Sequence, residues 1–234
     1  MAYETVFQRY ELKYLLTREQ RQAVLRAMEP YMRPDPHGKT TICNLYFDTA
    51  DYRLIRRSID SPIYKEKLRI RSYGPVAPEI TVFVELKKKY QKLVFKRRVA
   101  MAEKKAMDWL VNGGYSATSQ IAREIDYCLH HYPSLYPTAY LCYNREAYFA
   151  RKGDLRITFD DTILCRQEEL SLLAKAYGEP LLPPDITLME IKCTGGLPLW
   201  MTHTLSREHL YRTSFSKYGT AYQTLIRPSR QRED

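Results

Sequence analysis

Several features that mark common classes of protein are missing from this 234-residue sequence. No stretch approaches the roughly 20 apolar residues that span a bilayer, and residues 1–4 lack the charged-then-apolar pattern of a signal peptide. The five cysteines are widely spread, with no CxxC pair and no histidine at ligand spacing, which argues against a disulfide framework or a structural zinc site. We expect a cytoplasmic protein that associates with a membrane only through a partner.

Nucleotide-binding glycine motifs are also missing. Neither GxxxxGK(S/T) nor GxGxxG occurs, so any nucleotide is bound without a P-loop or a Rossmann turn. What the chain has is positive charge: 37 Lys and Arg against 27 Asp and Glu give a net charge of +10. This balance indicates a polyanionic partner, either nucleic acid, a membrane surface or a small polyanion.

The composition is that of a folded protein. Hydrophobic residues make up 44% of the chain and charged residues 27%, which is ordinary for a globular domain. A chain of this length normally shares one core. We expect a single domain over residues 1–234, with residues 228–234 as a frayed tail.

Alternation of apolar and polar residues indicates an antiparallel sheet with flanking helices. Eight segments alternate as strands do, namely residues 8–16, 41–48, 63–73, 80–90, 92–101, 137–150, 154–163 and 186–193. Helical spacing and capping residues predict helices over residues 17–30, 50–58, 103–111, 119–131, 199–210 and 216–226. Because most strands follow one another through turns, we expect an α+β fold whose eight antiparallel strands close into a barrel, a tunnel with flanking helices.

The charged faces of these strands are the strongest functional signal. One strand places Lys65, Lys67, Arg69 and Arg71 on a single face, and like charges this close repel one another unless an anion lies between them. A charged strand face that simply meets water is the alternative for any one strand. Further basic residues recur on the other strands, at Lys87, Lys89, Lys96, Arg98, Arg145 and Arg156.

A carboxylate accompanies these cations on three strands. Glu11, Glu85 and Glu190 each stand two residues before a lysine, a spacing that puts both side chains on one side of the pleat. Each Glu-x-Lys therefore combines a candidate metal ligand with a candidate phosphate ligand. If these faces line a barrel, its interior suits a polyphosphate chain bridged by Mg²⁺ or Mn²⁺.

Short motifs in a fixed order carry a resemblance to a known family. They are YELKY at residues 10–14, LYFDT at 45–49, KLRIRSYG at 67–74, VFVELK at 82–87, YNREAY at 143–148, LRIT at 155–158, EIK at 190–192 and FSKY at 215–218. In these motifs the chain resembles the polyphosphate-polymerase domain of the vacuolar transporter chaperone (VTC) complex. That domain is a branch of the triphosphate tunnel metalloenzymes, which also include CYTH-type phosphatases.

The resemblance implies a fold and a site. The family's fold is an eight-stranded antiparallel tunnel in which basic residues bind a nucleotide triphosphate and the product chain. Carried over by motif, the catalytic residues would be Lys67, Arg69, Arg71, Lys87, Arg145, Arg156 and Lys217, and the substrate-binding residues Lys13, Lys96, Arg98 and Lys192. Glu190 would bind Mn²⁺ or Mg²⁺, assisted directly or through water by Glu11 and Glu85.

The implied reaction transfers the ATP γ-phosphoryl group to the end of a growing polyphosphate chain and releases ADP. Such a transfer requires mainly alignment and charge neutralisation. CYTH phosphatases typically begin with Glu-x-Glu-x-Lys, whereas Arg9 takes the place of the first glutamate here. Because a hydrolase that organises metal-bound water benefits from more carboxylates, this departure favours the polymerase.

Two alternatives remain open on the sequence. The same tunnel is suited to hydrolysis of tripolyphosphate or a nucleoside triphosphate, and the basic chain is suited to binding RNA, polyphosphate or anionic lipid without catalysis. We expect ATP and inorganic polyphosphate as partners, and no nucleic acid. A basic outer patch of Lys104, Lys105, Arg56 and Arg57 is available to dock a membrane-protein partner through which product leaves.

Overall fold

The computed structural model describes residues 10–60, 63–91, 93–113, 115, 118–132 and 134–230. Of the tail expected over residues 228–234, residues 228–230 are helical and the rest lies outside the described residues, as does Arg9. Within the part of the chain that is described, no helix has the length and apolar content needed to cross a bilayer.

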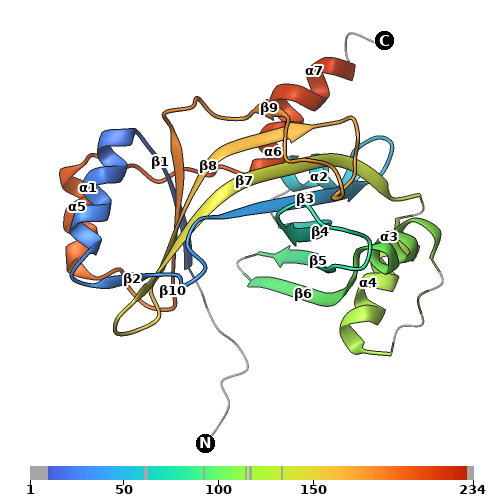
Figure 1. Ribbon diagram of the computed structural model, residues 1–234, viewed down its shortest axis with the longest axis horizontal. Helices are drawn as coiled ribbons and strands as arrows, with labels where there is room; N and C mark the ends of the chain where they lie inside the picture. Colours follow the sequence, from blue (N-terminus) through green and yellow to red (C-terminus); the bar gives the residue numbers. More distant parts are fainter. Residues whose placement is uncertain are drawn as a thin grey trace, which may run out of the picture. The chain divides into compact units, whose positions relative to one another are not determined.

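In the described residues, ten strands form one antiparallel sheet (Figure 1). They are β1 (Tyr10–Leu16), β2 (Met32–Pro34), β3 (Thr40–Asp48), β4 (Tyr64–Tyr73), β5 (Thr81–Tyr90), β6 (Leu93–Ala102), β7 (Tyr136–Ala150), β8 (Arg156–Arg166), β9 (Glu179–Pro180) and β10 (Thr187–Cys193). Hydrogen bonds order them β1-β10-β8-β7-β3-β4-β5-β6, with β2 paired to β7 and β9 paired to β8. The antiparallel sheet with flanking helices is confirmed. The order has two ends, β1 and β6, so among the described strands hydrogen bonds do not close the sheet into the expected barrel.

Most helices also lie where the sequence places them. They are α1 (Arg18–Met28), α2 (Arg53–Asp60), α3 (Glu103–Asn112), α4 (Gln120–His131), α5 (Leu199–Arg207), α6 (Lys217–Ala221), the π-helix η1 (Tyr222–Ile226) and α7 (Arg227–Arg230). Thr17 caps α1 as predicted, because its Oγ1 accepts a bond from the Gln20 N–H at 3.3 Å while Gln20 Oε1 accepts one from the Thr17 N–H at 3.0 Å.

The differences from expectation have local causes. The helix expected from residue 50 begins at Arg53, after a turn in which Tyr52 adopts a φ of 56°. The helix expected to reach residue 210 ends at Arg207, since His209 has a φ of 51° and a left-handed residue does not continue a right-handed helix. The short strands β2 and β9 carry too few residues for an alternating pattern, so the sequence did not predict them.

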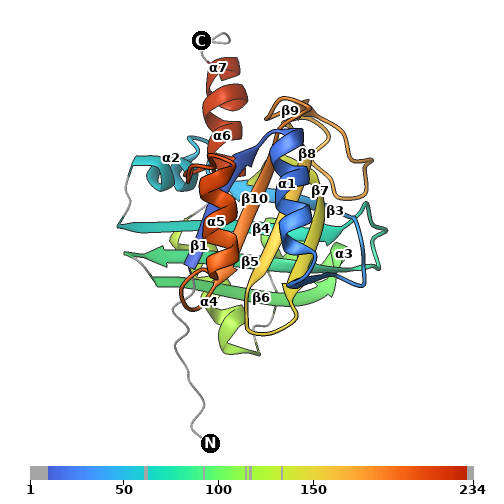
Figure 2. The same cartoon turned by 90° about the vertical axis from the view of Figure 1, so that its left-hand side faces the viewer.

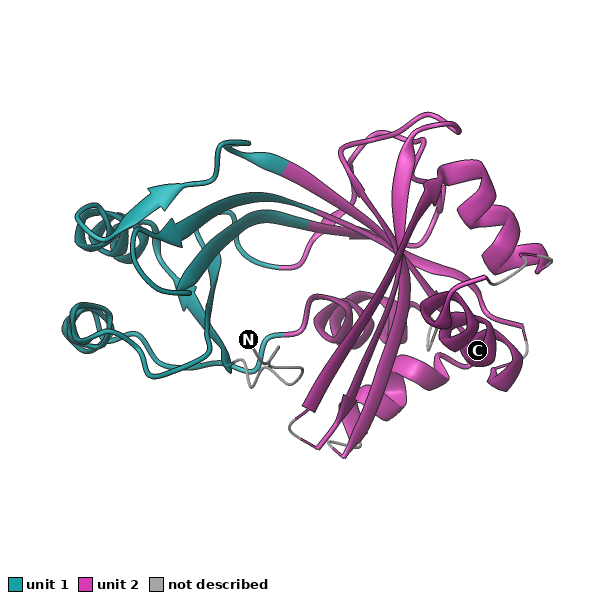
Figure 3. Cartoon of the chain, turned by 90° about the horizontal axis from the view of Figure 1, so that it is seen from below, with its two compact units in different colours: residues 1–40, 143–163, 182–215 teal, residues 41–142, 164–181, 216–234 magenta. Residues whose placement is uncertain are grey.

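The chain divides into two compact units (Figure 3). Unit 1 comprises residues 1–40, 143–163 and 182–215, and unit 2 comprises residues 41–142, 164–181 and 216–234. The expectation of a single domain over residues 1–234 stays a prediction.

Unit 1 has its own core, to which strands and two helices contribute. Leu16 of β1, Phe159 of β8 and Ile191 of β10 are fully buried in it, together with Val24 of α1 and Met201 of α5. The helices α1 and α5 lie side by side (Figure 2). Because successive strand residues point to opposite faces, the residues between these apolar ones face away from that core.

Unit 2 is built in the same way around a second core. Leu68 of β4 and Val84 of β5 are fully buried and belong to one cluster with Trp109 of α3 and Ile125 of α4. The predicted faces of β4 and β5 are confirmed, since the apolar residues at alternate positions are buried in this cluster. Apart from Lys88, which stands opposite Glu66, the basic residues of both strands therefore share the opposite face.

A buried carboxylate joins three elements of unit 2. Asp48, at the end of β3, accepts bonds from the backbone N–H groups of Thr49 (2.9 Å), Leu54 (2.8 Å) and Ile55 (3.0 Å). It also accepts a bond of 3.0 Å from the hydroxyl group of Tyr218 in α6. One side chain thus fixes the start of α2 and the position of α6 relative to β3.

We predict that Asp48→Ala lowers the free energy of unfolding by about 2–4 kcal/mol, because it leaves buried N–H groups and a buried hydroxyl group without an acceptor. Urea denaturation of the purified protein measures this change. Asp60→Ala, an exposed change at the end of α2, is the control and should alter stability by less than about 0.5 kcal/mol. Equal effects of the two substitutions would contradict this role of Asp48.

Candidate functional site

The basic face of unit 2 is organised around Glu85, whose side chain is 1% exposed. Arg69 donates to Glu85 Oε2 from Nε (2.9 Å) and Nη2 (2.7 Å). Arg98 donates to Oε1 from Nε (2.7 Å) and also from Nη2, and Lys96 Nζ lies 2.8 Å from the same oxygen. Arg71 Nε lies 3.8 Å from Oε2. One carboxylate therefore holds four of the predicted site residues together.

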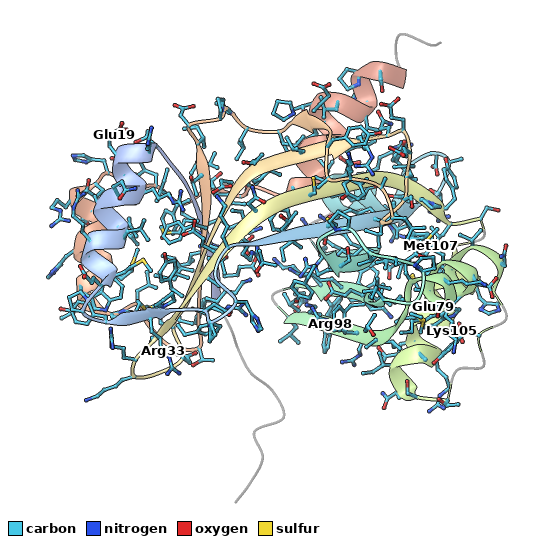
Figure 4. All side chains as sticks on the ribbon, viewed as in Figure 1. Glu19, Arg33, Glu79, Arg98, Lys105 and Met107 are labelled. Atoms are coloured by element: carbon cyan, nitrogen blue, oxygen red, sulfur yellow. The ribbon has the colours of Figure 1, made fainter. Side chains whose placement is uncertain are left out.

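Strand register produces this cluster. Arg69 of β4 and Arg98 of β6 both stand directly opposite Glu85 of β5, and residues opposite one another share a face. One step along, Lys67 and Lys96 both stand opposite Lys87. Figure 4 labels Arg98 on β6. The sequence predicts the faces, whereas the register decides which cations meet the carboxylate.

The charges shift the proton affinities of this cluster. Burial alone would raise the pKa of Glu85, but Arg69, Arg71 and Lys96 outweigh it and hold that pKa well below its usual range. Burial lowers the pKa of Lys96 to about 8, against the raising effect of Glu85. Glu85 is therefore ionised at neutral pH, and the pKa of Lys96 lies close to neutral pH.

Neutral side chains hold the two inner arginines from the neighbouring strand. The Tyr46 hydroxyl accepts a bond of 2.8 Å from Arg69 Nη1, and Asn44 Oδ1 accepts one of 3.0 Å from Arg71 Nε. Both residues lie on β3, directly opposite the arginines they contact. The alternating pattern of β3 places Asn44 and Tyr46 on one face, but only the register shows that this face meets the arginines.

The start of α6 contacts the strand that carries Lys67. Lys67 Nζ donates to Ser216 Oγ at 2.9 Å, and Ser216 Oγ accepts a bond of 3.2 Å from the Gly219 N–H as the N-cap of α6. Lys217 is the first residue of α6, which the bond from Tyr218 to Asp48 holds in place. These contacts bring the sequence motif at residues 215–218 to the strand that carries Lys67.

Unit 1 carries a second basic face, around Glu190. Lys13 of β1 lies directly opposite Glu190 of β10, and Glu11 lies opposite Lys192, so the two Glu-x-Lys motifs pair reciprocally. Glu190 lies 3.5 Å from Lys13 Nζ, 3.2 Å from Lys192 Nζ and 3.7 Å from Arg145 Nη2. The sequence predicted the spacing within each motif, and the structure adds the cross-strand pairing.

Arg145 and Arg156 complete this face. Arg145 of β7 makes a two-point contact with Asp160 of β8, at 2.6 Å (Nε to Oδ1) and 2.7 Å (Nη2 to Oδ2). Arg156 stands opposite Lys192, and its guanidinium lies 4.8 Å from the centre of the Phe149 ring. Sequence reasoning missed Asp160, although it lies on the same face of β8 as Arg156, because it belongs to no Glu-x-Lys motif.

Glu190, Glu11 and Glu85 are the carboxylates that the sequence predicts as metal ligands. The described residues contain no group of three or more His, Cys, Asp or Glu side chains arranged to hold a metal ion. A Mg²⁺ or Mn²⁺ ion held by one or two carboxylates, with phosphate oxygens and water as the other ligands, would not require such a group. Glu190 lies 3.2–3.7 Å from the nitrogens of three cations, whereas both oxygens of Glu85 accept close bonds from arginines. Glu11, on the same face as Glu190, contacts Lys13 Nζ at 3.4 Å.

We predict that Glu85→Gln destabilises the fold by about 3 kcal/mol at pH 7, because it leaves partly buried cations without their counter-charge. A lowered carboxyl pKa stabilises the fold above the pKa of the unfolded chain, about 4.3, and this contribution is lost as pH falls towards the folded value. The advantage of the wild type over Glu85→Gln should therefore begin to shrink below about pH 4 and continue to shrink as pH falls further. Urea denaturation at pH 7 and pH 3 measures the difference, and a gap that stays constant would contradict the account.

The match to a family model agrees with this geometry. The VTC domain model matches residues 8–226. No curated protein sequence matches this chain significantly.

Solved structures share the fold at low sequence identity. A protein from Hippeastrum, provisionally assigned as an adenylyl cyclase and described as having a dominant triphosphatase activity, is 17% identical, with a TM-score of 0.55 over 92% of this chain and 94% of that one. A protein from Bacillus halodurans, provisionally assigned as an adenylate cyclase, is 14% identical, with a TM-score of 0.54 over 89% of this chain and 95% of that one. The fold is thus that of the triphosphate tunnel proteins, and with the VTC domain matched over residues 8–226, the chain belongs to the VTC domain family.

Proposed function

We propose that this protein is a metal-dependent polyphosphate polymerase. A terminal phosphate oxygen of the polyphosphate chain attacks the γ-phosphorus of ATP, the bond from that phosphorus to the bridging oxygen of ADP breaks, and ADP leaves. The chain grows by one phosphate, and no covalent intermediate with the protein is needed. The observation that carries this proposal is that, in each unit, a buried glutamate gathers cations on the strand face opposite the core.

The basic residues supply what such a transfer requires. Phosphoryl transfer depends on alignment and on neutralising charge at phosphate oxygens. Arginines held by two-point contacts, such as Arg69 and Arg145, present their remaining donors in a fixed orientation, which suits phosphate. Mn²⁺ or Mg²⁺, with Glu190 and Glu11 as the protein ligands, would add charge neutralisation at the phosphates. Glu85 serves better to hold arginines than to bind metal.

Hydrolysis is the rival reaction. The Hippeastrum protein with this fold is described as a triphosphatase, and water could take the place of the chain end as the nucleophile. The presence of Arg9 where the phosphatases have a glutamate supports the polymerase. A cytoplasmic location and a membrane-protein partner for export remain part of this proposal.

Product analysis separates the two reactions. The purified protein is incubated with ATP, Mn²⁺ or Mg²⁺ and a short polyphosphate primer, and ADP, free phosphate and polyphosphate are measured together. We expect ADP matched by phosphate incorporated into chains. ADP matched by free phosphate would make the protein a triphosphatase.

The same assay tests the site. Glu190→Gln should abolish metal-dependent ADP release, and Arg69→Ala or Arg156→Ala should each lower its rate by about 10²-fold or more. Lys104→Ala, which removes an exposed cation of α3, is the control and should leave the rate unchanged. Normal rates in all three site variants would remove these residues from the mechanism.

A further inference from the structure

A cavity of about 530 Å³ lies in unit 2, lined by other residues than those that contact Glu85. Arg53, Arg56 and Arg57 of α2 line it, with Tyr132 beyond the end of α4. Leu54 and Ile55, which lie between these arginines in the sequence, are buried. The helix therefore packs on its apolar side and presents three guanidinium groups to the cavity.

Three cations at this spacing need an explanation. Arg53 lies three and four residues before Arg56 and Arg57, so all three share one side of the helix, where like charges destabilise it. Arg56 lies 3.7 Å from Asp51. Within the described residues, neither Arg53 nor Arg57 makes an ion pair with a carboxylate. Asp51 and Asp60 also line the cavity, so its side chains carry three positive charges and two negative ones, and the net charge stays positive.

Tyr132, which also lines the cavity, is held in place by its own contacts. Tyr132 is 2% exposed, and its hydroxyl donates a hydrogen bond to the buried Glu66. The Arg53 guanidinium lies 5.7 Å from the centre of the Tyr132 ring, and Arg57 Nη1 donates to the Tyr132 hydroxyl at 3.4 Å. These contacts orient both guanidinium groups and use few of their donors, since each guanidinium carries five N–H groups.

We propose that this cavity is a second phosphate-binding site, which holds a segment of the polyphosphate chain. Guanidinium groups bind phosphate through paired hydrogen bonds, and the hydroxyl groups of Thr49 and Ser134 also line the cavity. Its volume lies in the range of small-ligand sites. The choice of polyphosphate among phosphate-bearing anions rests on the proposed function, because such an enzyme makes a chain long enough to occupy more than one site.

Calorimetric titration with tripolyphosphate tests the proposal on the whole chain. The variant R53A/R57A should lose one class of binding site and keep the other. The control K104A/K105A removes the same charge from exposed positions of α3 (Lys105 is labelled in Figure 4) and should bind as the wild type does. An unchanged titration of R53A/R57A would overturn the proposal.

Two further arms identify the ligand. R53K/R57K keeps the charge but not the paired donors, so we expect tripolyphosphate to bind the cavity about tenfold more weakly or worse. Sulfate should displace tripolyphosphate from the cavity only poorly; equal displacement would show a general anion contact and overturn the proposal. ATP bound at the cavity in preference to tripolyphosphate would overturn the choice of polyphosphate.

The result does not depend on turnover. If the protein forms no polyphosphate yet R53A/R57A loses a tripolyphosphate site, the cavity binds oligophosphate and the proposed function alone fails. If polyphosphate forms and R53A/R57A binds tripolyphosphate as the wild type does, the cavity proposal alone fails. Thermal unfolding of each variant confirms that the comparison is between folded proteins.

Discussion

A buried carboxylate between cations is the interaction on which the basic face of unit 2 depends. Arg69, Arg71, Lys96 and Arg98 extend from neighbouring strands into one small region, where their mutual repulsion would separate them. Glu85 supplies the opposing charge and fixes the two arginines that stand opposite it by close hydrogen bonds. The cost of burying Glu85 is met by these contacts, so the carboxylate stays ionised and the cations stay oriented. Phosphate then meets donors that are already in place.

Unit 1 also places a buried carboxylate, that of Glu190, between cations. Lys13 and Lys192 stand on either side of Glu190 at 3.5 and 3.2 Å, while Asp160 fixes Arg145 at 2.6–2.7 Å. In unit 2, Glu85 alone contacts a lysine and fixes arginines. In unit 1, Glu190 contacts the lysines and Asp160 fixes Arg145. A carboxylate that is less tightly bound by arginine is better suited to share a divalent cation with phosphate oxygens. The two glutamates look alike in the sequence and differ in what their strands place opposite them.

The sequence predicted the strands and their faces because alternation is a local property. Leu68 and Val84 are buried and Arg69 and Glu85 share the other face, as the period of two requires. Register is not local, so the sequence did not show that Arg98 would meet Glu85 or that the motifs containing Glu11 and Glu190 would pair reciprocally. Neutral partners such as Tyr46 were missed for the same reason. The sequence placed Arg56 and Arg57 in an outer basic patch and did not show the cavity that they line, because residues from distant parts of the chain line it too.

The measurement that tests this account most directly is the affinity of Glu85→Gln for tripolyphosphate. Removing a negative charge from a basic face should tighten phosphate binding if charge alone matters. If Glu85 acts by orienting the cations, binding should instead weaken, by about tenfold. Glu79→Gln, an exposed change of the same charge in the same unit (Figure 4), is the reference. The account would be contradicted if Glu85→Gln bound tripolyphosphate as tightly as Glu79→Gln does, or more tightly.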